Sequence, residues 1–142
     1  VVNDDIIAAK EIDADGVHIG QSHMEYTKAR EILGPDKIIG VSAGNLAEAK
    51  EAERVGADYI GVGAVFHTDT KKDATSLTMA QLKEISEEVS IPVVAIGGIS
   101  IDNALELKGT GVDGICVISA IFGSENPSEA TKKLLVLSIQ IN

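Results

Sequence analysis

Residues 56–63, with the sequence GADYIGVG, have two counterparts in the chain: residues 13–20, DADGVHIG, and residues 111–118, GVDGICVI. Each segment places a turn of small residues and an aspartate directly before a short apolar run, and each follows a helical pattern that a small residue can end. Two further apolar runs cover residues 38–42 and 92–96. Because all five are nearly continuous in Val, Ile and Gly, they predict strands that are covered on both faces, as in a parallel sheet.

Amphipathic helical patterns separate these runs. The clearest covers residues 46–55, where Asn45 is the predicted N-cap and Glu48 follows three residues later, as in a capping box. The other patterns cover residues 79–89 and, more weakly, residues 6–12, 27–33, 102–107 and 128–139. Strand–helix alternation at this density predicts an α/β domain built on a parallel sheet.

The number of strands indicates part of a barrel. The five runs and a strand end at Val1 and Val2 give six strands in 142 residues, whereas a complete (β/α)8 TIM barrel takes at least about 200 residues. We therefore expect residues 1–142 to form a single, incomplete TIM-barrel domain that covers roughly strands 3–8 and their helices. Since the chain begins with Val rather than Met, we expect the opening of the barrel to precede Val1. Exposed sheet edges would favour pairing between chains, which leaves a homo-oligomer open.

Composition excludes some classes of partner. The net charge of −10 argues against nucleic acid or an anionic membrane as a partner. No apolar stretch approaches the length that spans a bilayer, and no basic-then-apolar leader opens the chain. The one cysteine, Cys116, excludes an internal disulfide and favours a reducing cytoplasm. Since Cys116 stands in an apolar run, we expect its side chain to be buried rather than nucleophilic.

Polar and small residues follow the predicted strands where each strand ends. They are Asn3, Asp4, Gln21, Ser42, Thr68 to Lys71, Gly97, Gly98 and Ser119. In parallel α/β folds the carboxyl ends of the strands meet at one rim, where ligands bind. The sequence therefore predicts a ligand site at this rim.

Two segments of the rim read as phosphate-binding loops. Residues 96–99, IGGI, follow one strand, and residues 117–121, VISAI, end the next and lead toward the last helix. Glycines let the backbone approach an anion, and free N–H groups at the start of a helix donate to it. The alternative for Gly97 and Gly98 is a tight turn, but the pairing with the Ser119 segment favours phosphate.

Three other groups are candidates for chemistry. Residues 66–73, FHTDTKKD, carry hydroxyl and ammonium donors suited to phosphate or pyrophosphate, although a solvated surface loop would look similar. The carboxylates that follow Asn3 suit Mg²⁺, although an N-cap for the next helix explains them nearly as well. His18 stands inside a strand, where a hydrogen-bonded interior imidazole is expected, and His23 follows a Gly-Gln turn at the rim.

In their order along the chain, seven short stretches resemble the thiamine phosphate synthase family. They are residues 2–4 (VND), 15–21 (DGVHIGQ), 40–42 (GVS), 61–66 (GVGAVF), 68–71 (TDTK), 96–99 (IGGI) and 118–121 (ISAI). The resemblance implies a transferase that joins aminopyrimidine methyl pyrophosphate to thiazole phosphate. Pyrophosphate leaves, and the thiazole nitrogen captures the resulting carbocation to give thiamine phosphate.

The resemblance also implies roles for particular residues. Asn3, Ser42 and Lys71 would bind the pyrimidine pyrophosphate, with Ser42 and Lys71 as the catalytic pair. The thiazole phosphate would lie against Thr68, Asp69, Thr70, Gly98, Ile118 and Ser119. Asp4 would ligate Mg²⁺, the implied cofactor, with His23 at the place of the family's second carboxylate. The substrates are thus phosphorylated small molecules, held by donors and a cation.

The chain departs from the family at several places. An imidazole is a poorer Mg²⁺ partner than a carboxylate, so His23 weakens the expected metal site. The family's Gln-x-Arg-x-Lys strand is absent from these residues, and His67 stands where proline is usual. Two alternatives stay open: a non-catalytic phosphate-binding barrel fragment, and the related thiazole tautomerase, which carries a histidine where this chain has Ala64.

Overall fold

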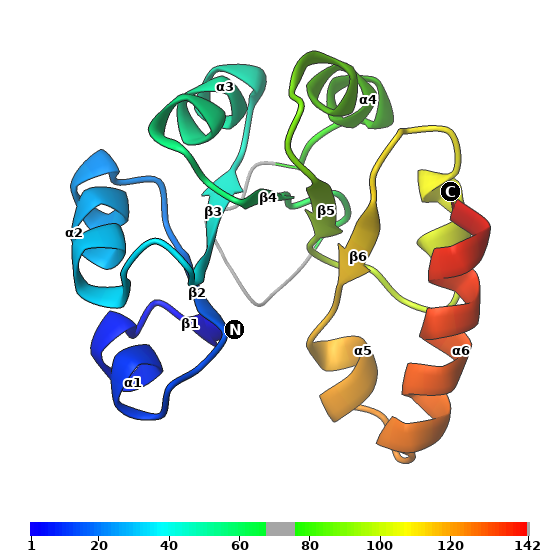
Figure 1. The fold of residues 1–142 in the computed structure, drawn as a ribbon. Helices are drawn as coiled ribbons and strands as arrows, with labels where there is room; N and C mark the ends of the chain where they lie inside the picture. The colour runs from blue at the N-terminus through cyan, green and yellow to red at the C-terminus, as the bar shows by residue number, and fades with distance from the viewer. Residues whose placement is uncertain (68–75, 142) are drawn as a thin grey trace.

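Six parallel strands form one sheet whose spatial order follows the chain (Figure 1). The computed structural model describes residues 1–67 and 76–141. The strands are β1 (Val2–Asn3), β2 (Gly16–Ile19), β3 (Ile38–Ala43), β4 (Tyr59–Val62), β5 (Val93–Ile96) and β6 (Gly114–Cys116). The predicted parallel α/β sheet is therefore confirmed, and each predicted apolar run contains a strand.

The helices are α1 (Ile6–Glu11), α2 (His23–Leu33), α3 (Leu46–Val55), α4 (Met79–Glu88), the 3-10 helix η1 (Ala104–Leu107), α5 (Ser119–Phe122) and α6 (Pro127–Ile141). The strongest pattern gave its helix correctly: α3 spans the predicted residues, and the side chain of Asn45 accepts the backbone N–H of Glu48 at 3.0 Å. The weaker patterns were less accurate. Helix α2 begins at His23, before the predicted start, and residues 102–107 contain only a 3-10 turn.

Two of the three repeated aspartates bind the strand next to their own. Asp58 precedes β4, and its Oδ2 accepts the backbone N–H of Ile39 in β3 at 2.7 Å. Asp113 precedes β6, and its Oδ2 accepts the N–H of Val93 in β5 at 2.8 Å. A buried or half-buried backbone N–H left without an acceptor is costly, so each aspartate stabilises the start of a neighbouring strand. This contact explains why the same motif recurs before β4 and β6.

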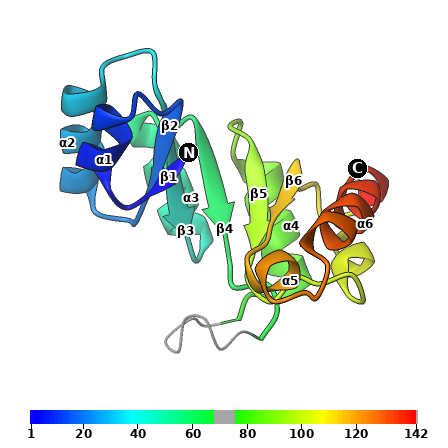
Figure 2. The same cartoon turned by 90° about the horizontal axis from the view of Figure 1, so that it is seen from below.

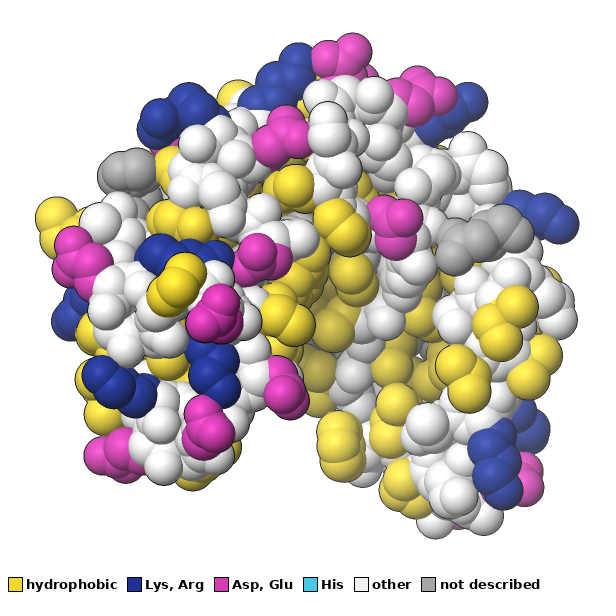
Figure 3. All heavy atoms as spheres, viewed as in Figure 1, with side chains coloured by type: hydrophobic (Ala, Val, Ile, Leu, Met, Phe, Trp, Pro, Cys, Tyr) yellow, Lys and Arg dark blue, Asp and Glu magenta, His cyan; other side chains and the backbone are white. Residues whose placement is uncertain are grey.

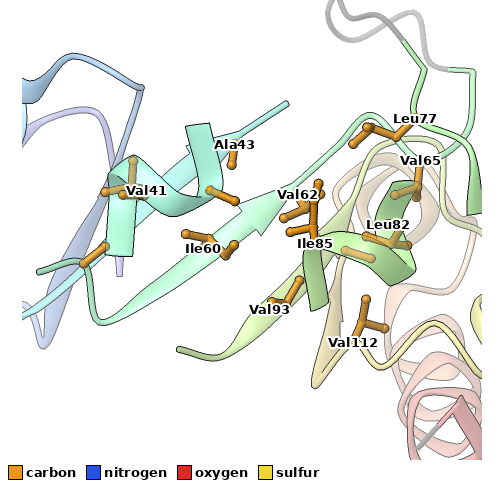
Figure 4. Close-up of a cluster of buried hydrophobic side chains, with 14 of the residues drawn as sticks. Val41, Ala43, Ile60, Val62, Val65, Leu77, Leu82, Ile85, Val93 and Val112 are labelled. Carbon is orange, nitrogen blue, oxygen red and sulfur yellow. The ribbon is translucent and has the colours of Figure 1, made fainter. Parts of the chain in front are cut away.

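The core lies between the convex face of the sheet and its helices. Alternate strand residues such as Val41, Ile60 and Val93 are buried, and they form one cluster with Leu82 and Ile85 of α4 and the small residues of α3 (Figure 4). Figure 1 shows the sheet as an arc with α1 to α4 outside it. None of the helices within residues 1–67 and 76–141 is long and apolar enough to cross a membrane.

The concave face of the arc is a hollow lined by apolar side chains (Figure 3). At its two ends, β1 and β6 each pair with a single strand within residues 1–67 and 76–141. Large apolar side chains near those ends are exposed, among them Ile7 beside β1 and Phe122 beyond β6. The described part of the chain is thus an open half-barrel.

The predicted burial of Cys116 was wrong: its side chain is exposed. Cys116 pairs with Ile96 and therefore shares the concave face with it. An apolar run indicates burial only where both faces and both edges of a strand are covered. At β6, the last strand of the sheet, that condition fails.

Candidate functional site

The carboxyl ends of the strands bring most of the predicted rim residues to one end of the sheet. The arrowheads of β3 and β4 point toward the end that carries α5 (Figure 2). The described residues at this end include Asn3, Asp4, Ser42, Gly98, Ile118 and Ser119. The predicted Thr68, Asp69, Thr70 and Lys71 lie outside the described residues.

The three polar residues at the end of β1 and just after it have separate roles. Asp5 is the N-cap of α1, and its Oδ1 accepts the backbone N–H of Ala8 at 2.8 Å. Asp4 does not cap the helix: its carboxylate accepts the side-chain amide of Asn3 at 2.7 Å. Its backbone N–H donates to the carbonyl of His18 at 2.8 Å, and its φ is 63°. The capping alternative therefore applies to Asp5, and Asp4 keeps an exposed carboxylate at the rim.

Glu48 connects the loops that follow β2 and β3. Its Oε2 accepts the backbone N–H of Gly44 at 2.6 Å and a hydrogen bond from the side chain of Gln21. In an ordinary capping box this carboxylate would return to the N–H of the N-cap residue, Asn45. Here it reaches one residue further back and fixes Gln21, so the Gly-Gln turn is held by α3.

A chain of hydrogen bonds crosses three strands on the concave face. The Nδ1 of His18 in β2 lies 2.9 Å from the Oη of Tyr59 in β4, and its Nε2 lies 3.0 Å from the Oγ of Ser42 in β3. The rings of His18 and Tyr59 are 5.4 Å apart between centroids. The predicted hydrogen-bonded interior imidazole is confirmed. Its partner Ser42 is also a predicted site residue, so His18 joins the set of candidate site residues.

Two glycines provide the space for these rings. A Cβ on Gly40 would lie 2.1 Å from the Tyr59 ring, and a Cβ on Gly61 would lie 2.9 Å from the His18 ring. Gly40 pairs with both His18 and Tyr59, and Gly61 pairs with Ser42. Thus β3 has no side chain where the Tyr59 phenol packs against it, and β4 has none where the His18 imidazole packs against it.

Burial raises the pKa of Tyr59 above its ordinary value of 10.0, and the nearby Cys116 contributes to the same direction. The neutral phenol is therefore favoured in the folded protein, and this contribution to stability declines as pH rises through the unfolded and then the folded pKa. We expect an ultraviolet titration of tyrosinate, taken as the difference between wild type and Tyr59→Phe, to give a midpoint above 10.0. A midpoint at or below that value would contradict the packing of the ring.

The loops after β5 and β6 lie side by side. Ile96 pairs with Cys116, so Gly98 and Ile118 each stand two residues beyond a paired position on neighbouring strands. Gly98 has a φ of 65°, and a Cβ there would lie 2.4 Å from the carbonyl oxygen of His67. Gly98 therefore also forms a tight turn, the alternative to phosphate binding, and this turn packs against Phe66 and His67 after β4.

The second of these loops leads directly into a helix. Ser119 is the first residue of α5, and the carbonyl of Ile118 accepts the N–H of Phe122 at 2.9 Å. The first N–H groups of a helix have no partner within it. Ser119 thus contributes both a hydroxyl and a helix start to the rim beside Gly98.

The metal prediction rests on Asp4. Among the described residues, no three His, Cys, Asp or Glu side chains come together in a group that could hold a metal ion. Mg²⁺ is commonly held by one or two carboxylates and the phosphates of a substrate, and the exposed carboxylate of Asp4 fits that mode. His23 is the first residue of α2, which places its backbone at the same rim; its side chain lies outside the described part of the structure.

Sequence reasoning missed Tyr59 and Glu48 as hydrogen-bond partners of the predicted residues. Tyr59 read as an ordinary strand residue and Glu48 as a helix-capping one. For Tyr59 the available signal was a glycine in each of two neighbouring strands, Gly40 and Gly61, because a bare strand position often marks the close approach of another group. Without the strand register, that signal does not say which side chain approaches.

These features define a class: a parallel α/β half-barrel whose polar rim lies at the carboxyl ends of its strands, as in barrel enzymes. The chain belongs to the thiamine monophosphate synthase family, whose model matches residues 1–121. The thiamine-phosphate synthase of Methanobrevibacter smithii is 57% identical over 135 residues, covering 95% of this chain and 65% of that protein. The enzyme of the same name from Clostridium botulinum is 53% identical over 134 residues, covering 94% and 63%.

The fold agrees with that membership. The structure of a thiamine phosphate pyrophosphorylase from Pyrococcus furiosus superposes with a TM-score of 0.89 at 48% identity, covering 99% of this chain and 67% of that one. The chain spans somewhat less than two thirds of the length of the M. smithii and C. botulinum relatives.

Proposed function

We propose that the protein is a thiamine phosphate synthase, which joins aminopyrimidine methyl pyrophosphate to thiazole phosphate and releases pyrophosphate. The observation that carries the proposal is the position of Asn3, Asp4 and Ser42 at the same rim as Gly98 and Ser119. The proposed pyrophosphate donors, Asn3 and Ser42, and the proposed donors for the second phosphate, at Gly98 and Ser119, then lie on opposite parts of the curved sheet. Family membership and the names of the relatives support the same reaction.

The reaction requires stabilisation of the negative charge on the leaving pyrophosphate and alignment of the thiazole nitrogen with the methylene carbon. The bond from the pyrimidine methylene carbon to the pyrophosphate oxygen breaks, both electrons leave with pyrophosphate, and the thiazole nitrogen donates a pair to the carbon. Asn3, Ser42 and Lys71 hold the pyrophosphate and stabilise its developing charge. Thr68, Asp69, Thr70, Gly98, Ile118 and Ser119 hold the thiazole phosphate so that the nitrogen faces the carbon.

Asp4 is the proposed ligand of Mg²⁺, with His23 at the second position. When bound, the ion would neutralise negative charge on the pyrophosphate. Asn3 donates to the Asp4 carboxylate and so fixes the direction in which its oxygens face. Asn3 therefore has two proposed roles: it orients the carboxylate of Asp4 for the metal, and it binds the pyrophosphate of the substrate.

We also propose that residues 1–142 are one domain and that its six strands correspond to strands 3–8 of a closed (β/α)8 barrel. The open edges at β1 and β6, with exposed Ile7 and Phe122 near them, support two further strand–helix units there. Those units would also cover Cys116. The proposed location is the cytoplasm, with small phosphorylated molecules rather than nucleic acid or membrane as partners.

The test is turnover by the protein expressed from its whole reading frame. Both substrates and Mg²⁺ are supplied, and thiamine phosphate and pyrophosphate are measured; equal amounts of the two are expected, and none without the metal. Saturable binding of thiazole phosphate without turnover would favour a phosphate-binding role instead. Isomerisation of a carboxylated thiazole without release of pyrophosphate would favour the tautomerase.

A further inference from the structure

We propose that His18 is a positioning residue that turns the hydroxyl proton of Ser42 toward the substrate, and that Tyr59 sets the tautomer in which His18 does so. This inference rests on the proposed function, since it assigns Ser42 the role of a donor to the pyrophosphate. The three side chains come from three adjacent strands, and their polar atoms are joined at 2.9 and 3.0 Å.

The direction of the two hydrogen bonds follows from the chemistry of the groups. A neutral imidazole has one N–H donor and one acceptor nitrogen. A phenol is more acidic than an alkyl hydroxyl, so it is the better donor, and its oxygen is the poorer acceptor because its lone pair is delocalised into the ring. Tyr59 therefore donates to Nδ1 of His18, and the Nε2–H of His18 donates to Ser42.

The burial of Tyr59 supports this direction. Burial raises its pKa, so the phenol keeps its proton throughout the neutral range and remains a donor. Once Ser42 Oγ accepts from His18, its own proton is free to point elsewhere. A hydroxyl whose oxygen is already engaged is a preorganised donor, which suits an oxygen that gains negative charge as pyrophosphate leaves.

The surrounding backbone keeps the imidazole in place. The His18 ring lies close to the bare backbone of Gly61, and the Tyr59 ring lies close to that of Gly40. Both rings thus lie close to the backbone of strands whose positions are fixed by the sheet. The orientation of Ser42 is thereby determined by the strand register rather than by a loop.

Two amide substitutions separate the contact of His18 with Ser42 from its contact with Tyr59. From Cβ, the Nε2 of Gln is as many bonds away as the Nε2 of His, whereas the amide of Asn reaches only as far as Nδ1. His18→Gln therefore keeps a donor for Ser42, and His18→Asn keeps only an acceptor for Tyr59. In the protein expressed from its whole reading frame, we expect His18→Asn to lower kcat about 100-fold, as for the loss of one preorganised donor, and His18→Gln to lower it less than about tenfold.

A double-substitution cycle distinguishes positioning from direct action. We expect Ser42→Ala to lower kcat about as much as His18→Asn, and the double variant to be no slower than Ser42→Ala alone. Losses that multiply would show that His18 acts on the substrate directly and would overturn the proposal. Equal rates for His18→Asn and His18→Gln, with equal urea midpoints, would overturn it as well.

The tautomer is measured without turnover. The nitrogen shifts of the His18 ring, assigned with the His18→Asn variant, are expected to show the Nε2–H tautomer in wild type and a mixture in Tyr59→Phe. The opposite tautomer in wild type would overturn the relay. Absence of thiamine phosphate from wild type would contradict the proposed function, while the ring spectrum would still support or overturn the relay.

Discussion

Replacing Gly16 by alanine is expected to lower the free energy of unfolding by about 3 kcal/mol or more, since a side chain forced into packed surroundings costs about this much. A Cβ at this buried position would lie 2.1 Å from the carbonyl oxygen of Ile38, its partner in β3. That atom belongs to the backbone of a central strand, so it cannot move aside without disturbing the ladder. Urea unfolding of the variant and of wild type measures the difference.

Gly114 is the matched control. It also follows an aspartate at the start of a strand, but, apart from its chain neighbours, none of the described residues has a heavy atom within 4 Å of the Cβ that alanine would add. In a chain of residues 1–142, Gly114→Ala is expected to be neutral or to stabilise by up to about 1 kcal/mol, because alanine restricts the unfolded chain. Equal losses at Gly16 and Gly114 would contradict the open edge at β6.

The same pair tests the proposed barrel. In the protein expressed from its whole reading frame, a strand beyond β6 would pair with β6. Its backbone would then lie as close to Gly114 as the backbone of β3 lies to Gly16. Gly114→Ala is then expected to become costly, on the scale of other overpacked positions. A neutral effect there would contradict closure of the sheet into a barrel.

The fold was predictable where its determinants are local. Runs of Val, Ile and Gly predicted the strands, and Asn45 with its following helical pattern predicted α3 to the residue. Burial of Cys116 was not predictable, because it depends on whether a further strand covers β6. Similarly, the short pattern at residues 102–107 did not show that Asn103 binds the Gly98 carbonyl and so belongs to the turn.

The site was predictable as a set of strand ends but not as a set of contacts. The position of Ser42 at the end of a strand follows from the sequence alone. Its contact with His18 depends on the register of β2 against β3, and that of His18 with Tyr59 spans 41 positions along the chain. The separation of Asp4 from Asp5 likewise depends on backbone direction: the φ of 63° at Asp4 leaves the cap to Asp5.

The different roles of Asp4 and Asp5 lead to the second prediction with a large expected effect, which concerns activity. Asp4→Asn is expected to lower kcat/KM about 100- to 1000-fold, since stabilisation of leaving-group charge by a metal is worth several kcal/mol and each 1.36 kcal/mol is tenfold. Asparagine keeps the shape of the side chain and an acceptor for the Asn3 amide, but it removes the negative charge that would attract Mg²⁺. The rate is measured over a Mg²⁺ titration, in which higher metal concentrations are expected to recover part of the loss.

Asp5→Asn provides the control one residue away. Asparagine is as good an N-cap as aspartate, so the bond to the Ala8 N–H and the stability of α1 are expected to persist. The two variants remove the same charge from neighbouring exposed positions, which makes any general effect of net charge equal in both. An equally large loss of activity in Asp5→Asn and Asp4→Asn would show that the loss comes from removing a negative charge anywhere in this region. Asp4 would then no longer be the proposed metal ligand.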